Sequence, residues 1–467
     1  MTGRRKRVER RPRQRARRVT SNVLQRSLLD SLNVFRPSLT RPGFQNMLVV
    51  FVGWVLTTGT HAVTQALVET GVAGRRHHEA FHRFFSRGTW DPDDLAHQLL
   101  QWILRRVAAD EPINVALDDT LTPKKGPHVF GIGSHVDAVR STRRHRVFCF
   151  AHCWVVLAIL LPVPFSGRTW AMPLLFRLYR NKKECESKGA PYRKKTELAR
   201  ELIDLLAHWV DRRRVVVVAD SAYCNDTVTR GLTASIVLVG AMRPDAVLTT
   251  PPPKRGKKSG RPRLRGRTLP KPQELARDER HPWQVCHANL YRRKRKVLYK
   301  TFCAQWYRAC ATRLLRIVVV RVDQGAIGIR VFFSMDARMS VTQILETYAE
   351  RWALEVCFRD LKQLLGFADS SARKRTAVER TAPFVGLTYT TLVLWFAEHA
   401  WQNPVAEPPV RPWYPHKCGL AFADVLRASQ RVLASLDVFD PPCIISNLRE
   451  PTQSRRKPRQ RRLRQAA

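Results

Sequence analysis

From residue 113 onward, short apolar runs rich in β-branched residues alternate with segments of helical character. The runs lie at INVALDD (113–119), VFCFAHCWVVLAILLPV (147–163), VVVVAD (215–220) and SIVLVGAM (235–242). The helical pattern TELARELIDLLAHWV (196–210) separates the second run from the third. Strands that alternate with helices are typical of a sheet covered by helices, because each strand must bury its apolar face against another element. The sequence therefore predicts an α/β core.

The segments before and within this core differ from it in composition. Residues 20–110 place apolar residues at helical spacing, which predicts an all-α segment ahead of the core. The stretch 249–272 is rich in Pro, Lys and Arg and cannot build a core of its own. Alternating patterns resume at 291–302, 313–322 and 328–336. A basic, β-rich segment is therefore expected to interrupt the α/β core.

The most clearly marked helix of the chain is predicted over residues 341–365. Ser340 and Gln343 have the spacing of a capping box at its start. Gly366 follows the last apolar residues and is expected to end the helix as a left-handed cap.

One face of this helix groups four polar side chains of different chemistry. At about 100° per residue, an arc of about 60° beside the apolar stripe contains Tyr348, Arg351, Glu355 and Lys362. A phenol, a guanidinium, a carboxylate and an ammonium at the edge of a sheet would form a phosphate-facing surface with one metal-binding carboxylate. The alternative is an ordinary solvated helix face with an Arg351–Glu355 ion pair at i,i+4 spacing.

Carboxylates also follow two of the apolar strands. Asp118 and Asp119 end the run at 113–119, and Asp220 ends the run at 215–220. Functional sites usually form at strand ends of α/β sheets. Two such aspartates and a helical glutamate could hold two Mg²⁺ about 3.5–4 Å apart, a geometry that activates a water or a 3′-hydroxyl against a phosphodiester. A single strand-end aspartate is more often structural, so the prediction depends on three carboxylates coinciding.

The charge of the chain points to a polyanionic partner. It has 82 Lys and Arg against 38 Asp and Glu, a formal net charge of +44. About half of this excess lies in three runs, at 1–18, 254–267 and 455–464. Solvated tails are the alternative for any one run. Because so large an excess repels itself unless a polyanion neutralises it, nucleic acid is the leading partner.

No membrane association is expected. The apolar stretch 47–58 is too short to span a bilayer. The stretch 147–165 contains His152, two prolines and many β-branched residues, which favours buried strands.

The motifs around these carboxylates resemble a large group of bacterial DDE insertion-sequence transposases. The segment YAERWALEVCFRDLK (348–362) matches the Y-x-x-R-x-x-x-E-x-x-x-x-x-x-K signature around the glutamate of that group. The segments LDDTLTPKKG (117–126) and VVVVADSAYCN (215–225) match the two aspartate motifs of that group in residue pattern and in order along the chain. AHCWVVLA (151–158) and GRPR (260–263) are also similar. The resemblance covers most of the chain.

The resemblance implies an RNase H-like, retroviral integrase-like fold. This is an α/β fold in which a mixed sheet has flanking helices, an all-α N-terminal domain precedes it and an inserted β-rich, basic subdomain interrupts it. The expected segments are a disordered basic arm (1–26), a helical DNA-binding domain (27–112), the first part of the catalytic core (113–244), the inserted subdomain with its Pro-rich loop (245–335), the second part of the core with the glutamate helix (336–400) and a C-terminal segment with a disordered basic tail (401–467).

The resemblance also implies a catalytic, metal-binding triad of Asp118, Asp220 and Glu355. The cofactor would be Mg²⁺, as two ions, with Mn²⁺ as a substitute. Asp118 is preferred because in the group the aspartate directly follows the apolar strand and lies two residues before a threonine, here Thr120. The adjacent Asp119 leaves that choice open.

Further residues are expected to bind DNA. The resemblance implies that Tyr348, Arg351 and Lys362 position DNA phosphates. The GRPR segment resembles a hook whose arginines seek narrow A·T minor grooves, and an unspecific loop is its alternative. The hook and the lysines before it comprise Lys257, Lys258, Arg261 and Arg263.

The expected activity is transposition by two-metal phosphodiester hydrolysis and strand transfer. The partners would be double-stranded DNA, both element ends and target, and further copies of this chain when two ends are paired. The family setting implies a cytoplasmic location at the nucleoid. Two alternatives remain, a catalytically inactive or repurposed DNA-binding protein and a basic RNA-associated protein. The latter leaves the carboxylates and the polar helix face unexplained.

Two further matches are attributed to chance or packing. HEAFH (78–82) fits a zinc-binding H-E-x-x-H pattern, but no convincing third ligand follows. The cluster of Cys149, His152 and Cys153 lies inside an apolar run without a second ligand pair.

Overall fold

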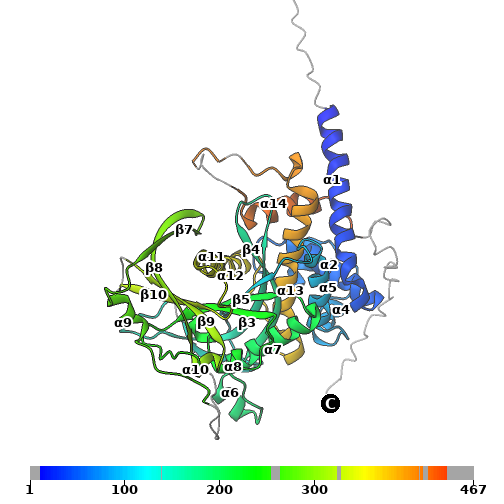
Figure 1. Cartoon of the computed structure of the whole chain (residues 1–467). Coiled ribbons are helices and arrows are strands. Elements are labelled where there is room, and N and C mark those ends of the chain that lie inside the picture. Colours follow the sequence, from blue (N-terminus) through cyan, green and yellow to red (C-terminus); the bar gives the residue numbers. More distant parts are fainter. Residues whose placement is uncertain are drawn as a thin grey trace, which may run out of the picture.

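A single mixed sheet forms the centre of the molecule (Figure 1). The computed structural model describes residues 11–137, 139–142, 144–253, 263–322, 328–409, 411–413 and 419–438. Within these residues the sheet has ten strands, in the order β2-β3-β1-β5-β6-β10-β9-β8-β7, with β4 also paired to β3. The strands are β1 (Ile113–Pro123), β2 (Gly133–Val136), β3 (Phe148–Pro162), β4 (Thr169–Tyr179), β5 (Val215–Ala219), β6 (Ile236–Met242), β7 (Gln284–Leu290), β8 (Arg293–Gln305), β9 (Leu314–Arg321) and β10 (Ile329–Ser334).

The central strands are buried and mixed in direction. β1 runs antiparallel to β3 and parallel to β5, and β5 runs parallel to β6. β5 consists of four valines and one alanine, and all five are buried, as expected for a strand with both faces covered. The prediction of a mixed sheet flanked by helices is confirmed, and the arrangement is consistent with an RNase H-like fold.

Strands from the segment 245–335 continue this sheet. β10 pairs antiparallel with β6, and β9, β8 and β7 follow outward to the edge. The segment expected to form an inserted subdomain therefore lengthens the central sheet by four strands.

Helices cover both faces of the sheet. They are α1 (Arg11–Leu32), α2 (Arg41–Leu56), α3 (Val63–Glu69), α4 (Glu79–Ser86), α5 (Pro92–Leu104), α6 (Lys182–Ser187), α7 (Lys195–Val210), α8 (Asp226–Thr229), α9 (Pro272–Arg277), α10 (Tyr307–Cys310), α11 (Val341–Glu350), α12 (Trp352–Leu364), α13 (Arg375–Trp395) and α14 (Phe422–Leu433), with shorter turns η1 (Asn33–Ser38), η2 (Ser221–Tyr223), η3 (Phe396–Ala400) and η4 (Pro404–Ala406). Figure 1 shows α11 and α12 inside the curve of the sheet, between β7 and β4. Within the described chain no helix combines the length and apolar character needed to cross a membrane.

The helices of the N-terminal third pack with helices from the other end of the chain. α13 contacts β4, α4, α5 and α1, and α14 contacts α2 (Figure 1). The indole N–H of Trp54 in α2 donates to the carbonyl of Leu365 at the end of α12, at 3.0 Å. The helical prediction for this part of the chain is therefore correct, and its helices share a layer with α13 and α14.

Part of the segment expected to be a basic arm is helical, and residues 1–10 lie outside the described residues. Residues 11–26, expected to be disordered, form the first part of helix α1. The second half of α1 buries Leu24, Leu28 and Leu32, which recur every four residues and so lie on one face. This apolar face packs on α13 and α14, and the helix continues N-terminally from that anchor.

The predicted helix 341–365 is two helices that meet at Arg351. The capping box is present, because the Gln343 N–H donates to Ser340 Oγ and the Ser340 N–H donates to Gln343 Oε1. Arg351 keeps right-handed dihedral angles (φ −52°, ψ −32°). Its N–H donates to the carbonyl of Tyr348, and the Leu354 N–H donates to the carbonyl of Arg351. The turn at Arg351 is thus tightened to i,i+3 hydrogen bonds between the two helices.

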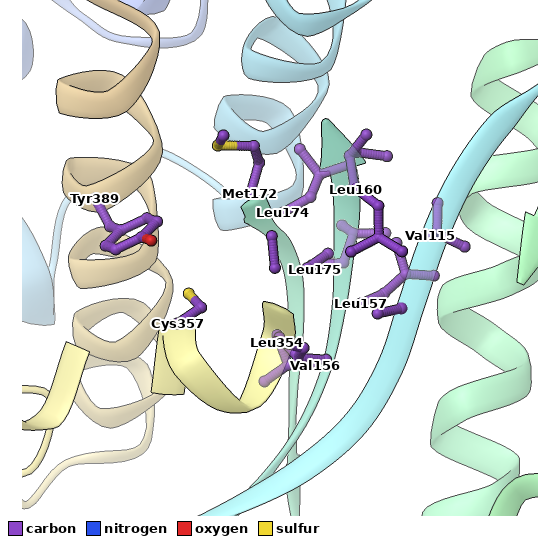
Figure 2. Close-up of a cluster of buried hydrophobic side chains, with 14 of the residues drawn as sticks. Val115, Val156, Leu157, Leu160, Met172, Leu174, Leu175, Leu354, Cys357 and Tyr389 are labelled. Atoms are coloured by element: carbon purple, nitrogen blue, oxygen red, sulfur yellow. The ribbon is translucent and has the colours of Figure 1, made fainter. Parts of the chain in front are cut away.

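The apolar side of α12 is anchored in the core. Leu354 and Cys357 are fully buried, and they face strands that carry Val156 and Leu175 (Figure 2). Tyr389 of α13 closes the cluster beside Cys357 (Figure 2). This packing holds the adjoining polar arc of α12 at the rim of the sheet.

We expect Gly366→Ala to destabilise the protein more than Gly71→Ala. Both glycines have left-handed backbones, with φ of +59° and +66°. A Cβ at Gly366 would lie 2.5 Å from the Cβ of His61, whereas a Cβ at Gly71 meets nothing within 4 Å. The unfolding free energy should fall by about 1 kcal/mol for Gly71→Ala and by about 3 kcal/mol for Gly366→Ala. Thermal melting of the two variants measures the difference, and equal shifts would contradict the predicted contact with His61.

Candidate active site

The register of β1 and β5 brings two predicted aspartates to one edge of the sheet. Leu117 pairs with Ala219 in the parallel ladder, and Asp118 and Asp220 are the next residues on these neighbouring strands. Asp220 caps the turn η2, where its Oδ1 accepts from the N–H of Ala222 at 2.7 Å. The carboxylates are near enough that the charge of Asp220 raises the pKa of Asp118.

The guanidinium of Arg351 joins two of the three predicted carboxylates. Its Nη1 donates to Asp118 Oδ2 at 2.6 Å, and its Nη2 donates to Glu355 Oε1 at 2.7 Å. These three residues come from β1, from the junction of α11 and α12, and from the first turn of α12. The contact between Arg351 and Glu355 has the i,i+4 spacing that the sequence predicts. The contact between Arg351 and Asp118 is a tertiary one, which joins the helix to β1.

Asp118 is in an environment that opposes its ionisation. Burial is the largest influence and raises the pKa of Asp118 to about 6. Arg351 and the backbone N–H of Asp119 lower it, while the charges of Asp220 and Asp119 raise it further. Asp118 and Glu355 share the one guanidinium, and the charge of Asp220 acts on Asp118 as well, so negative charge is in excess here.

Tyr348 belongs to the same cluster. Its ring lies 5.9 Å from the guanidinium carbon of Arg351 and packs on Phe332 of β10, with 4.6 Å between ring centroids. Burial is the main cause that raises the pKa of the Tyr348 phenol, and the charge of Asp220 contributes.

Lys362 lies farther along α12. It follows Glu355 by about two helical turns, a rise of roughly 10 Å. Burial lowers its pKa, and the groups that oppose this effect are Asp137 and Cys149, near β2 and β3. The structure therefore places Lys362 on the predicted helix but beside different neighbours from the carboxylate cluster.

The residues predicted in the basic loop are mostly outside the described structure. Arg263 is exposed. Lys257, Lys258 and Arg261 lie outside the described residues, so no geometry tests the predicted hook.

Asp119 points to the other face of the sheet. Its Oδ2 accepts from Lys195 Nζ at 2.6 Å, and its Oδ1 accepts from the Tyr223 hydroxyl at 2.7 Å. Consecutive strand residues face opposite sides, so Asp118 and Asp119 cannot serve the same site. The sequence analysis missed Lys195 and Tyr223. Tyr223 stands three residues after Asp220 in the same motif, whereas Lys195 carries no local signal.

The zinc-like patterns do not assemble a site. Glu79 of HEAFH pairs with Arg83 one turn on, at 2.7 Å, on the surface of α4. His152 is buried, and its Nε2 lies 2.9 Å from the carbonyl of Phe130. Within the described residues no three His, Cys, Asp or Glu side chains are arranged to hold a metal ion. At the carboxylate cluster such an arrangement is absent because the guanidinium of Arg351 lies between Asp118 and Glu355.

Two family models match the chain. One, described as DDE superfamily endonuclease, matches residues 34–309, which is more than half of the chain. The other, described as archaeal putative transposase ISC1217, matches residues 293–398. No curated protein matches the chain. The first match includes Asp118 and Asp220, and the second includes Glu355.

Proposed function

Because the chain belongs to the DDE superfamily of endonucleases, we propose that it is a DNA transposase of the Y-R-E-K signature group. In this proposal it cuts DNA at insertion-sequence ends and joins the ends to target DNA. Asp118, Asp220 and Glu355 are the proposed catalytic triad. The observation that supports this most is the contact of one guanidinium with carboxylates from β1 and α12.

The donor set of the cluster fits divalent metal ions, which enzymes of this superfamily use. Three carboxylates exceed the charge that Arg351 neutralises, and a bound cation would relieve the unfavourable ionisation of buried Asp118. Oxygen donors of this kind suit Mg²⁺. We propose two Mg²⁺ ions held by Asp118, Asp220 and Glu355, with Mn²⁺ as a substitute. Bound ions would lower the pKa of the attacking water or 3′-hydroxyl and stabilise the leaving oxygen.

The side chains around the triad would position DNA. The Nε–H of Arg351 is buried and without a hydrogen-bond partner in the described structure. This N–H could therefore donate a hydrogen bond to a phosphate oxygen of DNA bound at the carboxylates. Tyr348, stacked beside Arg351, would hold the guanidinium in place, and Lys362 would bind a phosphate farther along the strand.

Assembly and location follow from the proposed reaction. Pairing of two element ends requires more than one active site, which implies a homo-oligomer on DNA. Residues 27–112 are the proposed DNA-binding domain, and the cytoplasm, at the nucleoid, is the proposed location.

A cleavage assay tests the proposal. Labelled duplexes that carry the DNA flanking this gene would be incubated with the protein and Mg²⁺, Mn²⁺ or EDTA. We expect strand cleavage with either metal and none with EDTA, while gel-shift binding persists in EDTA. A duplex with scrambled ends is the control. Binding without cleavage under every metal condition would instead favour the alternative of an inactive, transposase-derived DNA-binding protein.

A further inference from the structure

The hairpin of β7 and β8 carries a concentrated positive charge. Residues 292–296, with the sequence RRKRK, are all exposed. The two strands and their turn, residues 284–305, contain no Asp or Glu. The charge is therefore not neutralised within the hairpin, which forms the outer edge of the sheet.

The tip of this hairpin is held in an unusual backbone conformation. Leu290 pairs with Arg293 across a two-residue turn, in which Tyr291 and Arg292 have φ of 53° and 68°. Such turns favour Asn and Gly, and larger residues are strained there. The N–H of Asn289 donates to Glu346 Oε1 of α11 at 2.7 Å, which fixes the tip.

The tip also reaches the helix that carries the proposed catalytic glutamate. The rings of Tyr291 and Trp352 meet edge to face, with 6.4 Å between centroids. Trp352 directly follows Arg351. A cavity of about 430 Å³ lies between the tip and the α11–α12 helices. Its charged lining residues are two arginines and two glutamates: Arg168, Arg292, Glu346 and Glu350.

The two faces of the hairpin differ in their neighbours: one faces α11, and the other faces away from it. Ala288 is buried, and Cys286 on the same face interacts with Thr342 of α11. Directly paired residues share a face, and Arg295 pairs with Ala288. Arg293 and Arg295 therefore lie on the face toward α11, and Lys294 and Lys296 lie on the opposite face.

We propose that the α11-facing side of the β7–β8 hairpin binds the phosphate backbone of duplex DNA through Arg293 and Arg295. This inference rests on the proposed function for its substrate. Guanidinium groups suit phosphates because they can donate two parallel hydrogen bonds. Glu346 of α11, which contacts the hairpin, and Glu355, which contacts Arg351, are nine residues apart and therefore lie on opposite sides of the helices. The hairpin and the carboxylates are thus separated by about one helix diameter, 10–12 Å. One turn of DNA is longer, about 34 Å, so a single duplex can contact both.

The matched variants remove equal charge from the two faces. One is the double variant Arg293→Gln/Arg295→Gln, and the other is Lys294→Gln/Lys296→Gln. Binding of a fluorescent duplex would be measured by anisotropy between 50 and 200 mM salt. For the arginine variant we expect binding roughly tenfold weaker and a slope of log K against log [salt] that falls by about 2, because each phosphate contact contributes about 0.9. The lysine variant should retain the slope of the wild type.

Each outcome decides one question. Equal losses in both variants would show unspecific attraction by the hairpin and overturn the assignment to one face. No loss in the arginine variant, with binding and cleavage by the wild type intact, would overturn this inference alone. Failure of the wild type to bind DNA would overturn the proposed function as well. Circular dichroism and thermal melting would confirm that both variants fold.

Discussion

Glu355→Gln should reduce DNA cleavage by roughly three orders of magnitude while leaving DNA binding nearly unchanged. The substitution keeps the size of the side chain but removes the negative charge that Arg351 contacts at 2.7 Å. A neutral amide is a poor ligand for a divalent cation compared with a carboxylate. The loss should therefore fall on chemistry, because the other groups that approach DNA are retained.

The measurement is single-turnover cleavage of a labelled end duplex, with gel-shift binding of the same duplex in parallel. Glu350→Gln is the matched control. Glu350 lies on the neighbouring helix α11, where its Oε1 accepts from the Thr169 hydroxyl at 2.9 Å, a bond that a glutamine can keep. Cleavage by the Glu355 variant at a rate within tenfold of the control variant would remove Glu355 from the proposed triad.

Asp118→Asn and Asp119→Asn should have opposite effects: the first should abolish cleavage, and the second should mainly lower the free energy of unfolding. Asp118→Asn is expected to abolish cleavage, again by roughly three orders of magnitude, without loss of metal-free stability. The pKa of Asp118 is raised to about 6 in the folded chain, so its ionised form is disfavoured by folding. That penalty grows as the pH rises through the interval between the unfolded and folded pKa values, and it is fully present above pH 6. An amide at this position avoids the penalty.

Asp119→Asn should instead lower the stability of the folded protein. It weakens the bonds to Lys195 and Tyr223, which tie β1 to α7 and to the turn after Asp220. We expect a loss of about 1–3 kcal/mol in unfolding free energy and a reduction in cleavage of roughly tenfold. Thermal melting in EDTA and cleavage in Mg²⁺, both at pH 8, measure the two profiles. If Asp119→Asn abolished cleavage and Asp118→Asn retained it, the proposed triad would have the wrong aspartate.

Much of the fold follows from local patterns that the sequence displays. The buried run VVVVA becomes β5, and the spacing of Ser340 and Gln343 produces the predicted cap. Gly366 adopts the left-handed conformation expected of a residue that ends a helix. These features depend on neighbours in the chain, and their patterns repeat at the period of the element that they form.

Parts of the candidate site could also be anticipated. The helical spacing of Tyr348, Arg351 and Glu355 places them together, and the strand-end positions of Asp118 and Asp220 place these two at one edge. The spacing could not show that Arg351 contacts Asp118, because that contact joins residues 233 positions apart. The catalytic roles of these residues stay predictions.

The sequence by itself determined several of the strands and helices, among them β5 and the capped helix that begins after Ser340, and that Asp118 and Asp119 must face opposite sides of a strand. Only the tertiary structure decided which side carries α12, and therefore which aspartate meets Arg351 and Glu355. It also decided that β7 to β10 extend the central sheet and that the N-terminal helices pack with α13 and α14. Local hydrogen bonds and side-chain periodicity act over a few residues and are visible in the sequence. The pairing of distant apolar faces depends on which combination buries the most surface, and no local pattern specifies that choice.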